Sequence, residues 1–327
     1  MTAGPIFVAG LERSGTSLAY AMLASHPRIA MTRRTNLWTH FYNQYGDLAD
    51  LDNFERCVAM MMRYKRIVKL QPDADRLRRD FLAGDRTYAR LFSLVEEHYA
   101  ERVGKPRWGD KSLNTENFAE PILNAYEGAR ILHMIRDPRD RFASSVTRWE
   151  KRRGGVGAGT AEWLASVHRA EEFQARFPAS YMIVRYEDLV TDPEETVSTI
   201  CGFIGEDYDP AMLTMGGAPS LTEKGFNSSY GPVEGIQIST ASIGRFRSIL
   251  PPSQVAFVQL VANEEMARHG YPSEPTELDG IAKYAYRTGR VPLELARMAA
   301  WRTRELVRDR RGRPVPEYRI VDSAPKS

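Results

Sequence analysis

A glycine-containing turn near the N-terminus has the spacing of a phosphate-binding loop. Gly10 and Gly15 are separated by four residues in the run Gly10-Leu11-Glu12-Arg13-Ser14-Gly15-Thr16-Ser17. Small residues let backbone N–H groups turn toward an anion, and a following helix adds about half a positive charge. Thr16 stands where nucleotide triphosphatases carry the lysine that reaches the β- and γ-phosphates. The run therefore predicts a phosphate site without that lysine; a plain capped turn is the alternative on spacing alone.

A second cluster of charged residues follows another apolar stretch. It begins with Arg136, and Asp137 and Pro138 have the types that start a helix. Ser144 lies about two turns into that helix, and helical side chains tilt back toward the N-terminus. Arginine supplies charge and a fork of donors, and serine supplies a neutral donor. Arg136 and Ser144 are therefore predicted to hold a further phosphate, with a surface arginine–aspartate network as the alternative.

Both loops need strands and helices to position them. Apolar stretches predict buried strands over residues 6–11, 130–135 and 181–186. Helices are expected over 16–25, 54–68, 85–102, 115–126, 160–177, 192–204 and 251–269, whereas 31–52 is expected to be mostly irregular and 154–159 a flexible loop. The alternation predicts an α/β fold, a three-layer sandwich with a central parallel sheet and a phosphate-binding first strand-to-helix turn. Ligands of such sheets bind at the carboxyl ends of the strands.

Composition narrows the class of protein. The 327 residues are 43% hydrophobic and 27% charged, values of a globular chain, and the net charge of +3 does not indicate a nucleic-acid partner. The two cysteines form no CxxC pair, so neither disulfides nor a thiolate metal site is expected, and a cytoplasmic location fits. No signal-like start and no run of about 18 apolar residues is found, so no membrane span is expected.

Together the two loops resemble those of sulfotransferases that use 3'-phosphoadenosine 5'-phosphosulfate (PAPS), in particular a bacterial branch related to tyrosylprotein sulfotransferases. The first loop matches the family's 5'-phosphosulfate loop, and Arg136 and Ser144, eight residues apart, match its 3'-phosphate motif. Supporting runs are Gly109-Asp110-Lys111-Ser112, Val184-Arg185-Tyr186-Glu187-Asp188-Leu189 and Gly244-Arg245-Phe246. The resemblance covers about residues 4–272. It implies a sulfotransferase domain over 1–272 that transfers a sulfuryl group from PAPS to an acceptor hydroxyl or amine without a metal.

The resemblance also implies roles for individual residues. It assigns the co-substrate to Arg13, Ser14, Gly15, Thr16, Ser17, Arg136 and Ser144, and to Ser228 and Ser229 in a loop that closes over it. Arg13 would stabilise charge on the leaving phosphate, and Lys111 would lie near the bridging oxygen. The general base stays open, because 31–36 carries no carboxylate where tyrosylprotein-type enzymes have a glutamate. His40 and Asp110 are candidates, as are Glu12 and Glu116. The pair Arg33-Arg34 is a candidate attractant for an acidic acceptor.

Residues 273–327 form a basic C-terminal extension that is expected to be partly helical. An amphipathic helix over 292–308 is expected to pack on the domain, with peripheral contact to an anionic membrane as the alternative. The acceptor is left as a small molecule, a glycolipid or another hydroxyl compound. A nucleotide kinase or triphosphatase and a non-catalytic binding protein are the rival functions; the missing loop lysine argues against the first.

Overall fold

Five parallel strands form a single sheet in the order β2-β3-β1-β4-β5. The computed structural model describes residues 4–148, 154–218, 238–276, 278, 280–311 and 313–321. The strands are β1 (Ile6–Ala9), β2 (Ile29–Arg33), β3 (Arg107–Lys111), β4 (Arg130–Ile135) and β5 (Tyr181–Arg185). The predicted parallel α/β class is confirmed. The prediction of a mostly irregular segment over 31–52 is wrong at its start, because Met31 to Arg33 belong to β2 and pair with β3.

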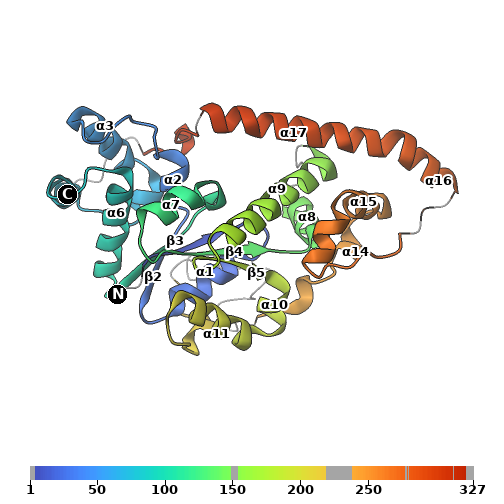
Figure 1. Cartoon of the computed structure of the whole chain (residues 1–327), viewed down its shortest axis with the longest axis horizontal. Helices are drawn as coiled ribbons and strands as arrows, with labels where there is room; N and C mark the ends of the chain where they lie inside the picture. Colours follow the sequence, from blue (N-terminus) through green and yellow to red (C-terminus); the bar gives the residue numbers. More distant parts are fainter. Residues whose placement is uncertain are drawn as a thin grey trace.

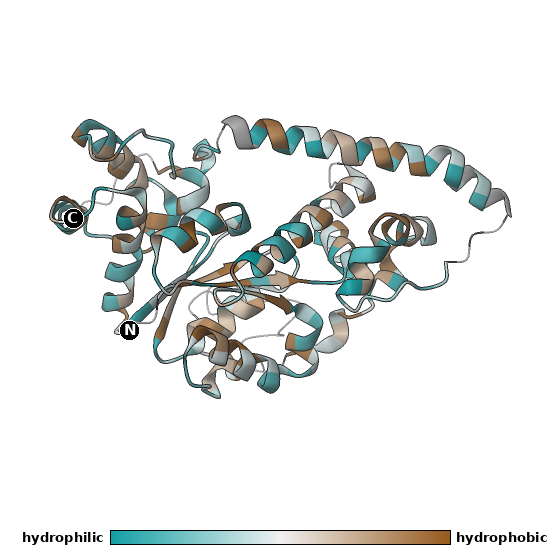
Figure 2. Ribbon diagram, in the orientation of Figure 1, coloured by the Kyte–Doolittle hydropathy of each residue, from teal (hydrophilic) through white to brown (hydrophobic). Residues whose placement is uncertain are grey.

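Helices cover both faces of the sheet and complete the predicted three-layer sandwich (Figure 1). Strand side chains alternate: Ile6 and Val8 pack with one group of helices, whereas Phe7 and Ala9 pack with the other. One face is covered by α1 (Thr16–Ser25), α10 (Tyr186–Thr191), α11 (Pro193–Ile204) and α12 (Ala211–Thr214). The other is covered by α2 (Leu37–His40), α3 (Leu51–Met61), α5 (Ala74–Leu82), α6 (Tyr88–Arg102), α7 (Ala119–Ala125) and α9 (Gly155–Arg176). Figure 2 shows hydrophobic residues in the central strands β4 and β5.

A third apolar cluster lies beside β4 and joins α8 and α9 to later helices. Its helices are α8 (Pro138–Arg148), α9, α14 (Phe246–Ile249), α15 (Pro252–Arg268) and, through Met298, α17 (Val291–Arg311). The described residues also form α4 (Lys65–Val68) and α16 (Gly280–Ala285). No helix within the described residues is long and apolar enough to cross a membrane.

The strand order creates a crevice between β1 and β4. After β1 the chain turns to β2 and β3 on one side, and after β4 it moves to β5 on the other. Loops that leave neighbouring strands in opposite directions open a crevice at the carboxyl ends, where ligands of open α/β sheets bind. The two loops predicted to bind phosphate follow β1 and β4, so they flank this crevice.

The glycine-rich stretch 154–159 is not a flexible loop. Residues from Gly155 onward form the first turns of α9, which lies against α17. The backbone N–H of Gly157 donates to Glu294 Oε2 at 2.8 Å, and a Cβ on Gly157 would lie 2.1 Å from the Glu294 carbonyl oxygen. Gly157 therefore allows α9 and α17 to approach closely. A glycine-rich sequence pattern does not distinguish this role from backbone flexibility.

The C-terminal extension crosses the molecule as a strap, here defined as residues 291–311 and 313–321. Its first part is α17, which runs along α9 (Figure 1). Its second part is bonded to the chain around α2 and α4: Lys65 Nζ donates to the Tyr318 carbonyl oxygen at 2.9 Å, and Val321 N donates to that of Arg63 at 2.8 Å. The strap is thus attached at both ends.

Replacing Gly157 by alanine should loosen α17. The added methyl group meets the Glu294 backbone, so Gly157→Ala is expected to destabilise the protein by about 1–3 kcal/mol. Gly202→Ala in α11 is the matched control, because nothing lies within 4 Å of its added Cβ and helical alanine is favoured by about 0.5–1 kcal/mol. Urea unfolding measures both variants. Equal or opposite effects would show that the close approach of α9 and α17 carries no constraint.

Candidate functional site

The loop after β1 is held tightly against β4 and α10. Gly10 and Gly15 have φ angles of 110° and 90°. A Cβ on Gly10 would lie 2.3 Å from the Met134 carbonyl oxygen, and one on Gly15 would lie 2.6 Å from Tyr186 Cδ2. Both positions therefore need glycine for backbone conformation and for space. Gly15 precedes α1, so the loop presents the N-terminus of that helix at the crevice.

The structure brings the two predicted phosphate motifs together. Arg13 Nε donates to Ser144 Oγ at 2.8 Å, which joins the loop after β1 to the helix after β4. Arg136 Nη1 donates to the Arg13 carbonyl oxygen at 3.1 Å, and Arg136 Nη2 donates to that of Ser242 at 2.6 Å. The Arg136 guanidinium also lies 4.4 Å from the centre of the Tyr186 ring. Arg136 and Ser144 are 4% and 6% exposed, so their geometry is set by packing.

The arginines near the two loops fall into two kinds, those paired with a carboxylate and those held by neutral groups. Arg139 and Arg141, on the same helix as Ser144, form ion pairs with Asp137 and Glu162. Arg13 and Arg136 instead contact a hydroxyl, carbonyl oxygens and a ring. A neutral partner positions a guanidinium without neutralising it, so these two charges stay available to an anion.

Further cations surround this pair. Burial lowers the pKa of Arg13, and Arg136 and Arg148 lower it further. Burial likewise lowers the pKa of Lys111 to about 7, with added repulsion from Arg34 and Arg33. Among the described residues, the buried Nε groups of Arg33, Arg34 and Arg136 have no hydrogen-bond acceptor. Glu12 is the carboxylate that acts on Arg13, Arg34 and Lys111. A bound polyanion would accept hydrogen bonds from these unpaired Nε groups, and its charge would offset the repulsion among the cations.

The other predicted loop residues lie in the same place. Ser14 and Thr16 are buried in the turn, and Ser17 Oγ accepts from Arg33 Nη2 at 3.2 Å. Ser228 and Ser229 lie outside the described residues.

Asp110 and Lys111 point to opposite faces of the sheet, since they are neighbours on β3. Asp110 Oδ1 accepts from Thr32 Oγ1 at 2.9 Å. Burial raises the pKa of Asp110, and the pKa of Glu96 is raised by burial and by Asp110. His40, the other candidate base in the prediction, has Nδ1 2.7 Å from the carbonyl oxygen of Arg313 in the strap, and burial lowers the pKa of His40.

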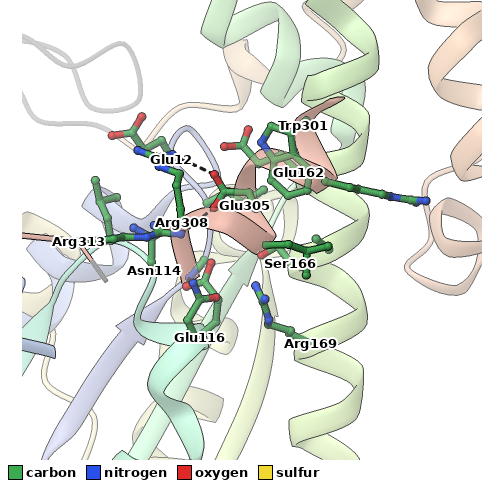
Figure 3. A pocket seen from close by; sticks show the side chains of 17 residues that line it. Glu12, Asn114, Glu116, Glu162, Ser166, Arg169, Trp301, Glu305, Arg308 and Arg313 are labelled. Carbon is green, nitrogen blue, oxygen red and sulfur yellow. Dashed lines mark hydrogen bonds and ion pairs between the residues drawn. The ribbon is translucent and has the colours of Figure 1, made fainter. Parts of the chain in front are cut away.

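A cavity of about 500 Å³ opens beside the first loop at the carboxyl ends of β1 and β3 (Figure 3). Its inner wall includes Gly10, Glu12 and Glu116. Glu116 is 3% exposed, and its Oε2 accepts from Gly10 N at 3.4 Å. The outer wall comes from α9 and from the strap, with Ser166, Arg169, Trp301, Glu305, Arg308 and Arg313 among its residues. Sequence reasoning named Glu12 and Glu116 but missed the outer wall, because no local pattern connects residues so far apart in the chain.

The described residues contain no cluster of three histidine, cysteine or acidic side chains that could hold a metal ion.

The chain is a parallel α/β protein with two joined, arginine-bearing loops at the carboxyl ends of β1 and β4, and comparison with known proteins gives the family. The sulfotransferase family model matches residues 5–210, so the chain belongs to the sulfotransferase family. The sulfotransferase domain of the Synechococcus PCC 7002 olefin synthase has the same fold, with a TM-score of 0.57 and 21% identity over 83% of this chain and 95% of that domain.

Two curated relatives are similar in sequence. A putative protein-tyrosine sulfotransferase of Caenorhabditis briggsae is 24% identical over 236 residues, 68% of this chain and 75% of that protein. An uncharacterized protein of Aquifex aeolicus is 26% identical over 222 residues, 64% of this chain and 26% of that protein. The chain therefore spans about a quarter of the length of the Aquifex relative.

The buried Lys111 should make stability depend on pH. Its pKa falls from 10.5 in the unfolded chain to about 7 in the fold, so between these values the unfolded state binds more protons and stability rises with pH. Against Lys111→Met, the wild type should gain roughly 2 kcal/mol of unfolding free energy between pH 7 and pH 9. Urea titrations at each pH measure the difference. Parallel curves for the two proteins would contradict the assignment of this pKa to Lys111.

Proposed function

We propose that this protein is a PAPS-dependent sulfotransferase that transfers a sulfuryl group to an acceptor hydroxyl. The observation that carries the proposal is the hydrogen bond between Arg13 and Ser144, which unites two anion-binding loops whose cations lack carboxylate partners. PAPS carries two separate phosphate groups, one for each loop. A nucleotide kinase is the weaker reading, because Thr16 replaces the lysine that holds a triphosphate.

The residues divide between the two ends of the co-substrate. Arg136 and Ser144 bind the 3'-phosphate, and residues 13–17 at the start of α1 bind the 5'-phosphosulfate. The acceptor oxygen attacks sulfur in line, the bond between sulfur and the 5'-phosphate oxygen breaks, and adenosine 3',5'-bisphosphate leaves. Arg13 and Lys111 stabilise the charge that builds on that phosphate oxygen. Because the negatively charged 5'-phosphosulfate binds close to Lys111, it raises the pKa of the Lys111 amine and keeps that amine protonated.

Glu116 is our proposed general base, which takes the proton of the acceptor hydroxyl. It lines the cavity beside Gly10, and one of its oxygens has only the long 3.4 Å contact to that residue. Asp110 is engaged with Thr32 inside the sheet, and His40 lies against the strap carbonyl of Arg313. Glu12 also lines the cavity, but its charge acts on Arg13, Arg34 and Lys111, so it serves the cation cluster.

A cytoplasmic site of action completes the proposal. Both cysteines, Cys57 and Cys201, are buried free thiols, which a reducing compartment preserves. The acceptor class follows from the cavity and not from the names of relatives, which include tyrosine and carbohydrate sulfotransferases.

The 3'-phosphate assignment is tested with two adjacent serines. Ser144→Ala should weaken binding of adenosine 3',5'-bisphosphate by about 10- to 100-fold, because a hydrogen bond to a charged group contributes roughly 1.5–3 kcal/mol. Its binding of adenosine 5'-monophosphate should weaken much less, because Ser144 acts on the 5'-phosphate only by positioning Arg13. Ser145→Ala is the control, since Ser145 Oγ donates to the Arg141 carbonyl oxygen within its own helix. Calorimetric titration gives the affinities.

The same titrations test the function. If the wild type binds ATP with Mg²⁺ but not the bisphosphate, the sulfotransferase proposal is wrong and a kinase is favoured. If Ser144→Ala weakens both nucleotides equally, the protein binds the nucleotide in another orientation.

Glu116→Gln should lower turnover with labelled PAPS by about 10²- to 10⁴-fold, the usual contribution of general base catalysis. Affinity for adenosine 3',5'-bisphosphate should stay the same, because Glu116 lies on the acceptor side of the loop. Glu12→Gln is the companion variant. A larger turnover loss in Glu12→Gln than in Glu116→Gln would transfer the role of base to Glu12.

A further inference from the structure

The C-terminal strap forms part of the cavity in which the acceptor must bind. Trp301, Glu305 and Arg308 of α17 and Arg313 beyond it line the same cavity as Gly10 and Glu116. These strap residues lie about a hundred positions beyond residue 210, where the family match ends. The strap therefore adds to the site a wall that the matched segment does not contain.

A second cavity of about 350 Å³ adjoins the first. Four residues line both cavities: Asn117, Arg169, Arg308 and Arg313. The far side of the second cavity is aromatic, with Trp38, Tyr42 and Phe118 packed against one another. The two cavities thus describe an elongated site that begins at the first loop, passes three guanidinium groups and ends on aromatic rings.

Three arginines and one asparagine line the junction of the two cavities. Arg308 and Arg313 both donate to the carboxylate of Glu305, at 2.9 and 2.7 Å. Glu162, on the same wall, is paired with Arg141. The Arg169 side chain forms no ion pair or hydrogen bond with a described residue, although it is half-buried and points toward the cavity (Figure 3). A half-buried guanidinium without a carboxylate partner is a site for an anion.

Two further carboxylates, Glu12 and Glu116, line the cavity beside the first loop. Glu116 contacts Gly10 at the first loop, where the acceptor hydroxyl must meet the sulfuryl group. A ligand that places its hydroxyl at Glu116 and extends through the junction would bring its next substituents to Arg169 and the strap arginines. An anionic group there gains charge-assisted hydrogen bonds, whereas a neutral group leaves Arg169 unpaired.

We propose that the strap completes the acceptor site and that Arg169, with Arg308 and Arg313 of the strap, binds an anionic group carried by the acceptor. This inference rests on the proposed sulfotransferase function. It assigns the acceptor to hydroxyl compounds that carry a carboxylate or another anion at a distance from the reacting oxygen.

The test uses the full chain saturated with adenosine 3',5'-bisphosphate, so that its phosphate sites are filled. Probes are matched phenols that differ only in an acid or its amide, such as 4-hydroxybenzoate and 4-hydroxybenzamide, or 4-hydroxyphenylacetate and its amide. Affinities are measured by calorimetry at constant ionic strength. Carboxylates should bind about 10- to 100-fold more tightly than their amides. Arg169→Gln should remove this preference and leave bisphosphate affinity unchanged.

Arg304→Gln is the matched control, because Arg304 is exposed on α17 and does not line either cavity. It should keep the preference for carboxylates. Arg308→Gln tests the strap itself and should reduce the preference, with the Tm of the nucleotide complex as the check on folding.

Three results would overturn the inference: carboxylates that bind no better than amides, an unchanged preference in Arg169→Gln, or an equal loss in Arg304→Gln. Failure of the bisphosphate itself to bind would instead overturn the proposed function.

Discussion

Repulsion among buried cations at the crevice between β1 and β4 is the constraint on which the site depends. Two unit charges about 4 Å apart repel by roughly 4 kcal/mol at an effective dielectric constant of about 20. The fold accepts this cost because neutral groups hold the cations: Ser144 for Arg13, and carbonyl oxygens and the Tyr186 ring for Arg136. Trp163 adds to this support by donating Nε1 to the Arg136 carbonyl oxygen at 2.8 Å. A bound polyanion offsets this cost by attracting the cations, so the arrangement favours polyanion binding.

The co-substrate half of the site was predictable because it is local in the sequence. Each loop directly follows a buried strand and opens a helix, so residue spacing alone places Arg13 just before α1 and Ser144 about two turns into α8. A parallel sheet then brings both loops to one edge. The sequence could not give the contacts between them, such as Arg136 with the Arg13 carbonyl oxygen, because these depend on the order of strands.

The remaining features follow from packing between distant segments, and there the predictions were incomplete or wrong. The apolar run of β2 is only Ile29 to Met31, because Thr32 and Arg33 follow, so its pattern is too short to distinguish from a loop. The glycine-rich pattern around Gly157 indicates a flexible loop, because the contact with the backbone of Glu294 joins residues that are far apart in the sequence. The outer wall of the cavity also depends on packing between distant segments. Arg169 and Arg308 line the same cavity because α17 packs on α9.

Charge is distributed unevenly in and beside the cavity. Glu12 and Glu116 line it together with Gly10, whereas Arg169, Arg308 and Arg313 line the part that it shares with the second cavity. Arg13 and Lys111 are not part of this lining, although the charge of Glu12 acts on both of them. Carboxylates repel an anionic group and guanidiniums attract it. For the proposed reaction, this distribution favours an acceptor that directs its anion toward the strap and its hydroxyl toward the first loop, which is the orientation that in-line transfer requires.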